Sequence, residues 1–381
     1  MPRLLVVSTV AETLEGFFLP HADHFRSRGW IVDAAAHGAA SNPGCLRAYD
    51  RAFDVPWSRD PRDVRRQLQG AVAIRRLLRD GSYDIVHMHT PVASLLTRLA
   101  AASLGRRVRP KLVYTAHGFH FHAQGSVAGN LVFGAIERLA GKWTDRLVVT
   151  NQEDRRTARS RSIAGPGSMR FIPGVGVDLD VYRPTEDIGL RARVRDELGI
   201  PIDAPFLLVV AELNTEKRHR DAISALALMD HRTAHLVLAG AGPLETHLRL
   251  LGRQLLLTDR LHLLGYRADV PSLMNAADVL VLPSSREGLS RSVIEAQAVG
   301  LPVLGADVRG IRDLLDQDRG VLYPVGDVRR MAEALDRLLQ QPEEARRRAA
   351  SARAAIGRYE LQVILRAHEE LYEDLLRAPE L

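Results

Sequence analysis

The sequence predicts an α/β protein built from two parallel-sheet domains of the Rossmann type. Twelve short apolar runs alternate with helix-like segments, six in each half of the 381-residue chain. This alternation is typical of parallel strands that are buried on both faces and connected by helices. A hydrophobic content of 46% over this length also favours two cores rather than one.

Composition narrows the class of protein further. The chain has 52 Lys and Arg against 46 Asp and Glu, a formal charge of +6, and this modest excess gives no reason to expect a nucleic-acid partner. The only cysteine is Cys45, which excludes a disulfide framework. The sequence has neither a leader-like start nor an apolar run long enough to cross a membrane, so we expect a cytoplasmic protein.

The first domain is predicted over residues 1–184. The loop Ser8–Glu15, after the first strand, lacks the G-x-G-x-x-G fingerprint, which disfavours an NAD-dependent enzyme. The predicted strands are Leu4–Val7, Ile31–Ala36, Ile85–Met88, Leu112–Thr115, Leu147–Thr150 and Met169–Ile172.

Histidines gather at the ends of two of these strands. The motif YDIVHMHTP places His87 and His89 at the C-terminal end of one strand, and YTAHGFHFH places His117 directly after the next. Because open α/β sheets bind ligands at this edge, we expect His117 to donate a hydrogen bond into a ligand cleft. No carboxylate at helical spacing completes a metal ligand set, so we predict no metal and interpret His87 and His122 as structural.

The segment Arg62–Gly81 predicts a basic helix with an apolar stripe. Such a helix suits an anionic lipid surface, and a solvated helix face is the alternative. Its arginines are Arg62, Arg65, Arg66, Arg75, Arg76 and Arg79.

The second domain is predicted over residues 185–357, because Pro184 and the polar stretch after it interrupt the pattern. Residues 358–381 form a C-terminal segment with apolar residues at helical spacing, which we expect to cross back to the first domain. The strands of the second domain are Phe206–Val210, His235–Ala239, Leu261–Leu264, Val279–Leu282, Pro302–Leu304 and Gly320–Tyr323.

The stretch from Asp278 to Asp307 carries the most chemistry. It predicts a strand, a polar loop, and a helix that begins near Ser290 and ends before Gly300. Gly288 lets a ligand approach the backbone, and the free amides at the helix N-terminus suit a phosphate. Glu287 and Glu295 flank this anion site and can bind hydroxyl groups on either side of it, as the sugar and ribose of a nucleotide sugar require.

Two further loops are expected at the same sheet edge. Lys217 and Arg218 follow the first strand of the second domain and could neutralise a diphosphate, with a solvated charged loop as the alternative. Gly265, Tyr266 and Arg267 follow another strand, where a planar base could rest against the backbone.

These motifs together resemble the retaining glycosyltransferases of family 4. REGLSRSVIEA is similar to the E-x7-E signature of that family, and YDIVHMHTP, YTAHGFHF, IPGVGVD, LNTEK and LLGYRADV occur in its order and spacing. The resemblance covers the whole chain and implies the GT-B fold, two facing Rossmann-like domains. It is strongest to the branch that assembles capsular and exopolysaccharide repeat units.

The resemblance also implies residue roles. It assigns the diphosphate to Lys217, the transferred sugar to Glu287 and His117, and the donor ribose to Glu295. The other donor-binding residues that it implies are Gly288, Leu289 and Ser290 for the phosphate, Gly265, Tyr266 and Arg267 for the base, and Asn214. The chain departs from the family at Glu212, where many members have arginine, and this leaves more of the diphosphate charge to Lys217 and the helix N-terminus.

By resemblance, the protein is expected to transfer a hexose or N-acetylhexosamine from a nucleoside-diphosphate sugar, most simply a UDP-sugar, with retention of configuration. It would need no metal or other cofactor. The acceptor would be a sugar or a lipid-linked sugar. An anionic membrane surface, on the inner face of the cell membrane, is a further expected partner. The alternatives are transfer to a soluble small molecule, a nucleotide-sugar epimerase, and a non-catalytic nucleotide-sugar binding protein.

Overall fold

The structure is a computed structural model that describes residues 1–60, 62–105, 109–119, 121, 127–165 and 167–377. The chain divides into two compact units, Met1–Val175 with Ile364–Leu381, and Gly176–Val363. The segment 176–184, which the sequence placed in the first domain, therefore belongs to the second unit. The predicted third segment, 358–381, is divided between the two units at residue 363.

The first unit contains a parallel sheet of seven strands in the order β3-β2-β1-β4-β5-β6-β7. All six predicted strands are present. The seventh, β3, was not predicted because it is an edge strand with the sequence RAFD and exposed charged ends, so it has no apolar run. The strands are β1 (Arg3–Val10), β2 (Ile31–His37), β3 (Arg51–Asp54), β4 (Ile85–Met88), β5 (Lys111–Ala116), β6 (Arg146–Val149) and β7 (Met169–Phe171).

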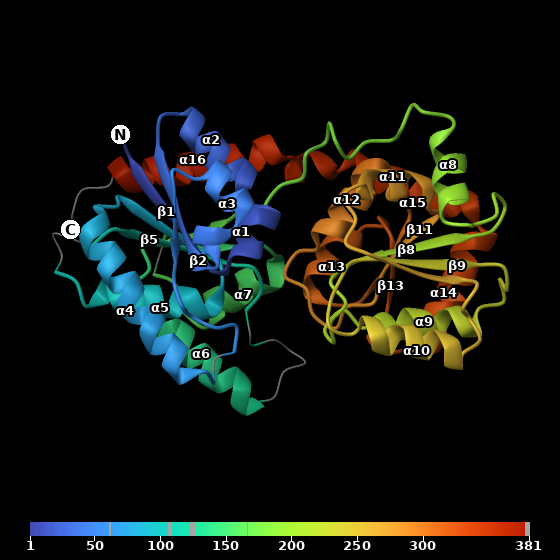
Figure 1. The fold of residues 1–381 in the computed structure, drawn as a ribbon, viewed down its shortest axis with the longest axis horizontal. Helices are drawn as coiled ribbons and strands as arrows, with labels where there is room; N and C mark the ends of the chain where they lie inside the picture. Colours follow the sequence, from blue (N-terminus) through green and yellow to red (C-terminus); the bar gives the residue numbers. More distant parts are fainter. Residues whose placement is uncertain (61, 106–108, 120, 122–126, 166, 378–381) are drawn as a thin grey trace. The chain divides into compact units, whose positions relative to one another are not determined.

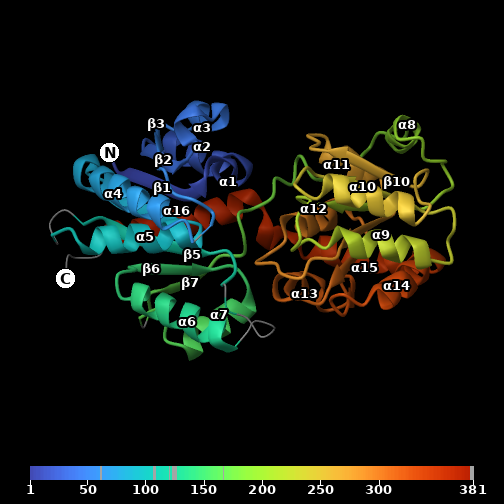
Figure 2. The same ribbon diagram turned by 60° about the horizontal axis from the view of Figure 1, so that its bottom comes forward.

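Helices cover both faces of this sheet (Figures 1 and 2). One core joins the strands to α1, α2, α3 and α16, and the other joins them to α4, α5 and α7. The helices are α1 (Ala11–Phe17), α2 (Leu19–Ser27), α3 (Pro43–Ala48), α4 (Val64–Gly81), α5 (Pro91–Ala102), α6 (Val127–Gly141), α7 (Gln152–Ser160) and α16 (Leu361–Arg377), with a 3₁₀ turn at Ala39–Ser41.

The prediction of a loop over Ser8–Glu15 was wrong. Strand β1 continues to Val10, and α1 begins at Ala11 without an intervening loop. The side chain of Thr9 explains the longer strand, since its hydroxyl lies 2.7 Å from the Thr90 hydroxyl and its amide donates to the same oxygen at 2.8 Å. These bonds hold the end of β1 beside the segment that follows β4.

The second unit contains a parallel sheet of six strands in the order β10-β9-β8-β11-β12-β13, and all six were predicted. Its strands are β8 (Phe206–Val210), β9 (His235–Ala239), β10 (Leu261–Gly265), β11 (Val279–Leu282), β12 (Val303–Ala306) and β13 (Val321–Tyr323). Its helices are α8 (Leu190–Glu197), α9 (His219–Leu228), α10 (Glu245–Gln254), α11 (Val270–Ala276), α12 (Arg291–Val299), α13 (Arg309–Leu315), α14 (Val328–Gln340) and α15 (Pro342–Ala354), with a 3₁₀ turn at Ile356–Tyr359. Separate apolar cores lie on the two faces of this sheet.

The C-terminal helix α16 contributes to the core of the first unit from Ile364 onward. Its side chains Ile364, Leu371 and Tyr372 are buried in the same cluster as Phe25 of α2. The ring of Tyr372 lies 4.9 Å from that of Phe25, centroid to centroid. Among the helices that the structure describes, none combines the length and the apolar character needed to cross a membrane.

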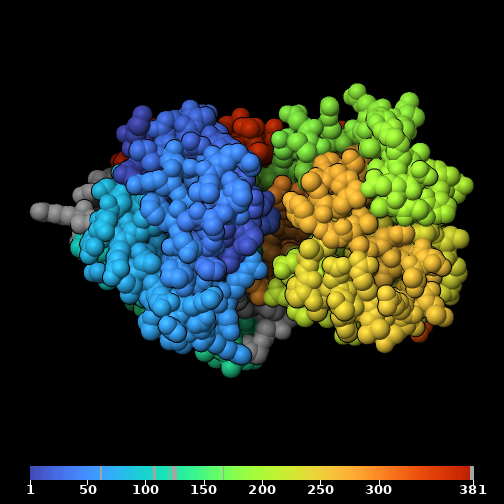
Figure 3. Space-filling view, in the orientation of Figure 1, coloured from blue at the N-terminus to red at the C-terminus, as the bar shows by residue number. Residues whose placement is uncertain are grey.

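Figure 3 shows the molecular surface in the orientation of Figure 1. The early part of the chain, coloured blue, makes up most of the visible face of the first unit.

Candidate functional site

The candidate site in the second unit is built from loops at the C-terminal edge of its sheet. These loops are joined by backbone hydrogen bonds. The Leu213 amide donates to the Ala241 carbonyl at 3.0 Å, and the Ser285 amide donates to the Glu216 carbonyl at 2.8 Å. The loop after β8 is therefore held between the loops after β9 and β11, as the order of the strands requires.

Two glycines allow this close approach. A Cβ atom at Gly240 would lie 1.9 Å from the Ala211 carbonyl oxygen, and one at Gly242 would lie 2.6 Å from that of Leu213. Backbone atoms cannot move aside as a flexible side chain can, so a larger residue at either position would push the loops apart. The glycines of the AGAGPLE motif thus serve loop packing.

Lys217 and Glu287 meet directly, although 70 residues separate them in the sequence. The Lys217 ammonium lies 2.6 Å from Glu287 Oε1, and the side chains are 25% and 9% exposed. The Lys217 amide donates to Asn214 Oδ1 at 3.1 Å, so Asn214 orders the loop that carries the lysine. The structure therefore brings together three of the residues that the sequence assigned to the donor.

Helix α12 begins at Arg291, with Ser290 as its N-cap. The Ser290 hydroxyl accepts a hydrogen bond from the Val293 amide, and Gly300 ends the helix in the left-handed conformation with φ 78°. Both ends agree with the sequence prediction. The loop before α12 is tightly enclosed, since a Cβ at Gly310 would lie 2.1 Å from the Gly288 carbonyl oxygen. Gly288, Leu289 and Ser290 therefore lead from Glu287 to the positive end of the helix.

Glu295 is a buried carboxylate that lies one helical turn after Arg291. The Arg291 guanidinium lies 2.8 Å from Glu295 Oε1, and the Glu295 side chain is 7% exposed. Burial raises the pKa of Glu295, while Arg291 and a hydrogen bond from Tyr182 oppose that shift. Sequence reasoning missed both partners. The i, i+4 spacing of Arg291 and Glu295 could have revealed the first, but Tyr182 is more than 100 residues away and carries no such signal.

The loop after β10 holds the residues predicted to contact a base. Gly265 has φ +68°, a conformation that favours glycine, and Tyr266 is 83% exposed. The Arg267 guanidinium binds Asp269 at 2.6 Å and Glu197 at 3.0 Å, and these contacts raise its pKa. The Arg267 guanidinium is therefore occupied by two carboxylates, while the exposed Tyr266 side chain can contact a ligand.

Arg218 and Glu212, two further charged residues of the loop after β8, differ in their contacts. The Arg218 guanidinium donates to the buried Asp221 carboxylate at 2.6 Å, which favours a structural role for Arg218. Glu212 is exposed and accepts a hydrogen bond from the Asn214 amide group at 3.2 Å. Glu212 therefore supports Asn214, which in turn holds the Lys217 backbone.

In the first unit, the predicted histidines form a contiguous group with the C-terminal helix, in which His87 and His89 are buried and His117 is half-buried. His87 bonds through Nδ1 to the Tyr372 hydroxyl at 2.5 Å and through Nε2 to the Thr115 hydroxyl at 2.7 Å. His89 Nδ1 lies 3.2 Å from His117 Nε2, and the ring of Phe18 lies 3.9 Å from that of His89.

These contacts define what His117 can do. Its Nε2 is occupied by His89, so the nitrogen that can serve a ligand is Nδ1. Burial lowers the pKa of His117 to about 4 and also lowers the pKa of His87 and His89, so the group is uncharged at neutral pH. His120 and His122, the other histidines of the motif, lie outside the described residues.

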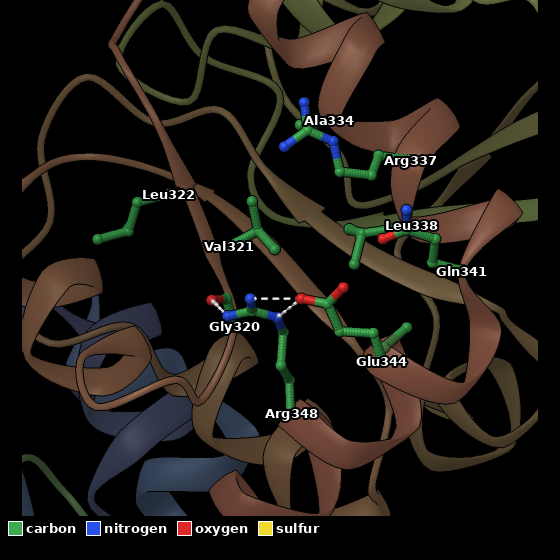
Figure 4. A pocket seen from close by; sticks show the side chains of 10 residues that line it. Gly320, Val321, Leu322, Ala334, Arg337, Leu338, Gln341, Glu344 and Arg348 are labelled. Atoms are coloured by element: carbon green, nitrogen blue, oxygen red, sulfur yellow. Dashed lines mark hydrogen bonds and ion pairs between the residues drawn. The ribbon is translucent and has the colours of Figure 1, made fainter.

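In the described part of the chain, no group of three or more His, Cys, Asp or Glu side chains could hold a metal ion. A pocket of about 210 Å³ lies in the second unit beside β13, α14 and α15 (Figure 4). Arg348 enters it and binds Glu344, and none of the predicted donor residues lines it. The candidate donor site is therefore defined by the converging loops and not by this pocket.

Known proteins are similar to this chain over nearly its whole length. Residues 191–355 match the family described as Glycosyl transferases group 1, and residues 19–181 match Glycosyltransferase Family 4. A Bacillus subtilis (strain 168) protein named glycosyltransferase EpsD is 33% identical over 349 residues, which cover 91% of this chain and 89% of that protein. The Escherichia coli UDP-Gal:alpha-D-GlcNAc-diphosphoundecaprenol alpha-1,3-galactosyltransferase is 30% identical over 295 residues, or 76% of this chain and 74% of that enzyme.

Solved structures show the same fold. Anabaena Alr3699/HepE in complex with UDP-glucose superposes with a TM-score of 0.80 at 18% identity, covering 98% of this chain and 100% of that chain. WaaG, a glycosyltransferase involved in lipopolysaccharide biosynthesis, gives a TM-score of 0.77 at 19% identity, with 98% and 100% coverage. With the two Rossmann-like units and the family matches, these similarities show that the chain belongs to the family 4 glycosyltransferases of the GT-B fold.

Proposed function

We propose that this glycosyltransferase moves a hexosyl or N-acetylhexosaminyl group from a UDP-sugar to a hydroxyl group of a saccharide or lipid-linked acceptor, with retention of anomeric configuration, in polysaccharide or glycolipid assembly. The observation that carries the proposal is the contact between Lys217 and Glu287 just before the N-terminus of α12. It places a cation and a carboxylate together beside a helix end that favours an anion.

The proposal gives the two residues different tasks. Negative charge develops on the departing diphosphate, and Lys217 and the amides at the start of α12 stabilise it. Glu287 faces the transferred sugar, whose anomeric carbon becomes positively charged as the bond to phosphate breaks. In this scheme no metal ion is required, because the lysine and the helix supply the positive charge.

Retention follows from a same-face substitution. The bond from the anomeric carbon to the phosphate oxygen breaks, the acceptor oxygen bonds to the same face of that carbon, and the acceptor proton passes to the leaving phosphate oxygen. In this scheme Glu287 pairs with Lys217 through one carboxylate oxygen and acts on the transferred sugar without a covalent intermediate. Glu295 is assigned to the ribose hydroxyls, Tyr266 to the base, and Nδ1 of His117 to a hydroxyl of the sugar.

Two of the similar proteins support the choice of donor and acceptor. The Escherichia coli relative is named for UDP-Gal as donor and a diphosphoundecaprenol-linked acceptor, and the Anabaena structure contains UDP-glucose. These substrates belong to those proteins, and they make UDP-sugars and lipid-linked saccharides the first to test here.

A donor screen tests the proposal. The purified full chain is incubated with UDP- and GDP-sugars and candidate acceptors, with and without EDTA. Release of UDP, a product of the expected mass and an α-linkage from an α-linked donor by proton NMR support it. A new UDP-sugar formed without acceptor would instead indicate an epimerase, and UDP binding without turnover of any donor would indicate a non-catalytic protein.

A further inference from the structure

Helix α6 turns its apolar side chains outward. The residues it buries are Gly134, Glu137 and Ala140, which form a narrow inner face of small side chains and one carboxylate. A surface helix normally buries its large apolar residues, so α6 is inverted. Its exposed large residues include Val127 (77%), Leu131 (66%), Val132 (57%), Ile136 (37%) and Leu139 (51%).

Specific contacts fix this inverted orientation. Glu137 accepts a hydrogen bond from the buried Arg98 at 3.0 Å, and the two form an ion pair inside the unit. A Cβ atom at Gly141 would lie 1.8 Å from the Ile163 carbonyl oxygen, a backbone atom that cannot move aside as a flexible side chain can. Rotation of the helix would break the ion pair and bring a larger residue against this carbonyl, so the apolar face is held outward.

The charges that border this face are basic. From Val127 to Lys142, all of which the structure describes, the exposed charged residues are Arg138 and Lys142, because Glu137 points inward. At about 100° per residue, both lie on the same side of the helix as Leu131. On the neighbouring α7, Arg156 and Arg159 are exposed, and Arg161 just after it donates to the Asn130 carbonyl of α6 at 3.0 Å.

The basic helix α4 belongs to the same layer of helices. Helix α4 packs against α5, and α5 packs against α6, on one face of the sheet (Figure 2). Val64, Leu68 and Val72 are 63%, 64% and 52% exposed and recur every four residues, so they form an outward stripe between arginines. The apolar and basic pattern of α6 is therefore repeated on α4.

We propose that the outward face of α6, with its basic border, docks onto the anionic surface of a lipid bilayer and lies in the plane of the interface. The apolar side chains would enter the headgroup boundary while the cations meet lipid phosphates. A 15-residue helix is only about 22 Å long, shorter than the roughly 30 Å of a bilayer core, so it lies on the membrane and does not span it.

The basic charge of the outward α6 face favours an anionic lipid surface, rather than a second copy of the chain, as its partner. A two-fold dimer through this face would bring the same patch of both copies together, so Arg138 and Lys142 of each copy would face a patch whose exposed charges are also basic. Anionic headgroups neutralise these cations instead. The inference rests on the proposed function in one respect, that a lipid-linked acceptor is presented at this surface.

Co-sedimentation of the full chain with lipid vesicles tests the docking. Wild-type protein should sediment with phosphatidylcholine vesicles that contain phosphatidylglycerol, and less with phosphatidylcholine alone. The variant Leu131→Ser/Leu139→Ser should lose roughly tenfold or more of its partitioning. The matched control Leu228→Ser/Leu250→Ser removes two leucines that are 54% and 52% exposed in the second unit and should bind as wild type.

A charge variant gives an independent readout. Arg138→Glu/Lys142→Glu should reduce sedimentation with anionic vesicles, and added salt should weaken wild-type binding. Equal sedimentation of wild type and the leucine variant would overturn the proposal, as would no wild-type sedimentation at low salt. A dimer in analytical ultracentrifugation that the leucine variant abolishes, without vesicle binding, would also overturn it in favour of a second copy.

Donor turnover in solution separates this inference from the proposed function. UDP release without vesicles should be the same in wild type and all three variants, which also shows that they are folded. If wild type sediments as expected but releases UDP from no donor, the docking surface stands and the proposed reaction fails.

Discussion

Replacing Lys217 with alanine separates catalysis from stability at the candidate site. The substitution removes the ammonium that lies 2.6 Å from Glu287 and leaves a carboxylate that is 9% exposed without that partner. Two effects follow. The folded protein contains an unpaired, largely buried carboxylate, and the departing diphosphate loses one cationic contact.

The two effects differ in size. Lys217 is a quarter exposed and water screens the pair, so we expect a stability loss of about 1 kcal/mol, at the low end for an unpaired buried group. For a unit of this size that corresponds to about 2–4 °C in Tm. Loss of a charge that acts on the transition state costs about 10²–10³ in kcat. Lys217→Ala should therefore be nearly as stable as wild type but at least a hundredfold slower, taking the lower figure.

The double variant Lys217→Ala/Glu287→Gln supplies the decisive comparison. Glutamine removes the unpaired charge, so Tm should return toward that of Glu287→Gln alone, while kcat for UDP release at saturating donor should stay low. If Lys217→Ala turned over donor at the parental rate, or if the double variant recovered the rate of Glu287→Gln, then the lysine would serve only to balance the glutamate and the diphosphate assignment would be wrong.

Three further predictions concern the rest of the site and the first unit. Glu295→Gln should weaken UDP binding about tenfold in calorimetry. Because burial raises the pKa of Glu295, the affinity of the wild type for UDP should fall as pH falls through that raised value. An equally steep fall in the variant would contradict the assignment. Burial lowers the pKa of His117 and His368 to about 4 from the ordinary 6.5, so the unfolded chain binds more protons between these values. As pH drops below 6.5, the free energy of unfolding of the first unit should then decrease by up to about 1.4 kcal/mol per pH unit for each histidine. All three tryptophans belong to this unit and report its unfolding by fluorescence. A free energy of unfolding that did not change with pH would refute the prediction. Gly240→Ala should destabilise the second unit by about 1–3 kcal/mol in thermal unfolding and weaken UDP binding in calorimetry, because its Cβ would meet a carbonyl oxygen. The control Gly357→Ala, whose Cβ would have nothing within 4 Å, should change neither stability nor UDP binding.

The strands were the most predictable part of the fold. Parallel strands buried on both faces require continuous apolar runs, and all twelve such runs form strands. Strand β3 escaped prediction because its edge position buries little and so leaves no pattern in RAFD. The boundary of α12 was also predictable, since Ser290 and Gly300 supply local capping chemistry that does not depend on the rest of the chain.

By itself, the sequence determined the two-sheet α/β architecture and a set of polar residues at strand ends, because both depend on local periodicity and on the rule that parallel strands end at one edge. Only the tertiary structure decided which of those residues touch. It paired Lys217 with Glu287 and His89 with His117, and it placed Tyr182 on Glu295. It also decided that the apolar side of α6 faces outward. Helical periodicity shows that a helix has an apolar side, but the Arg98–Glu137 pair and the close backbone contact of Gly141 determine which side the fold buries.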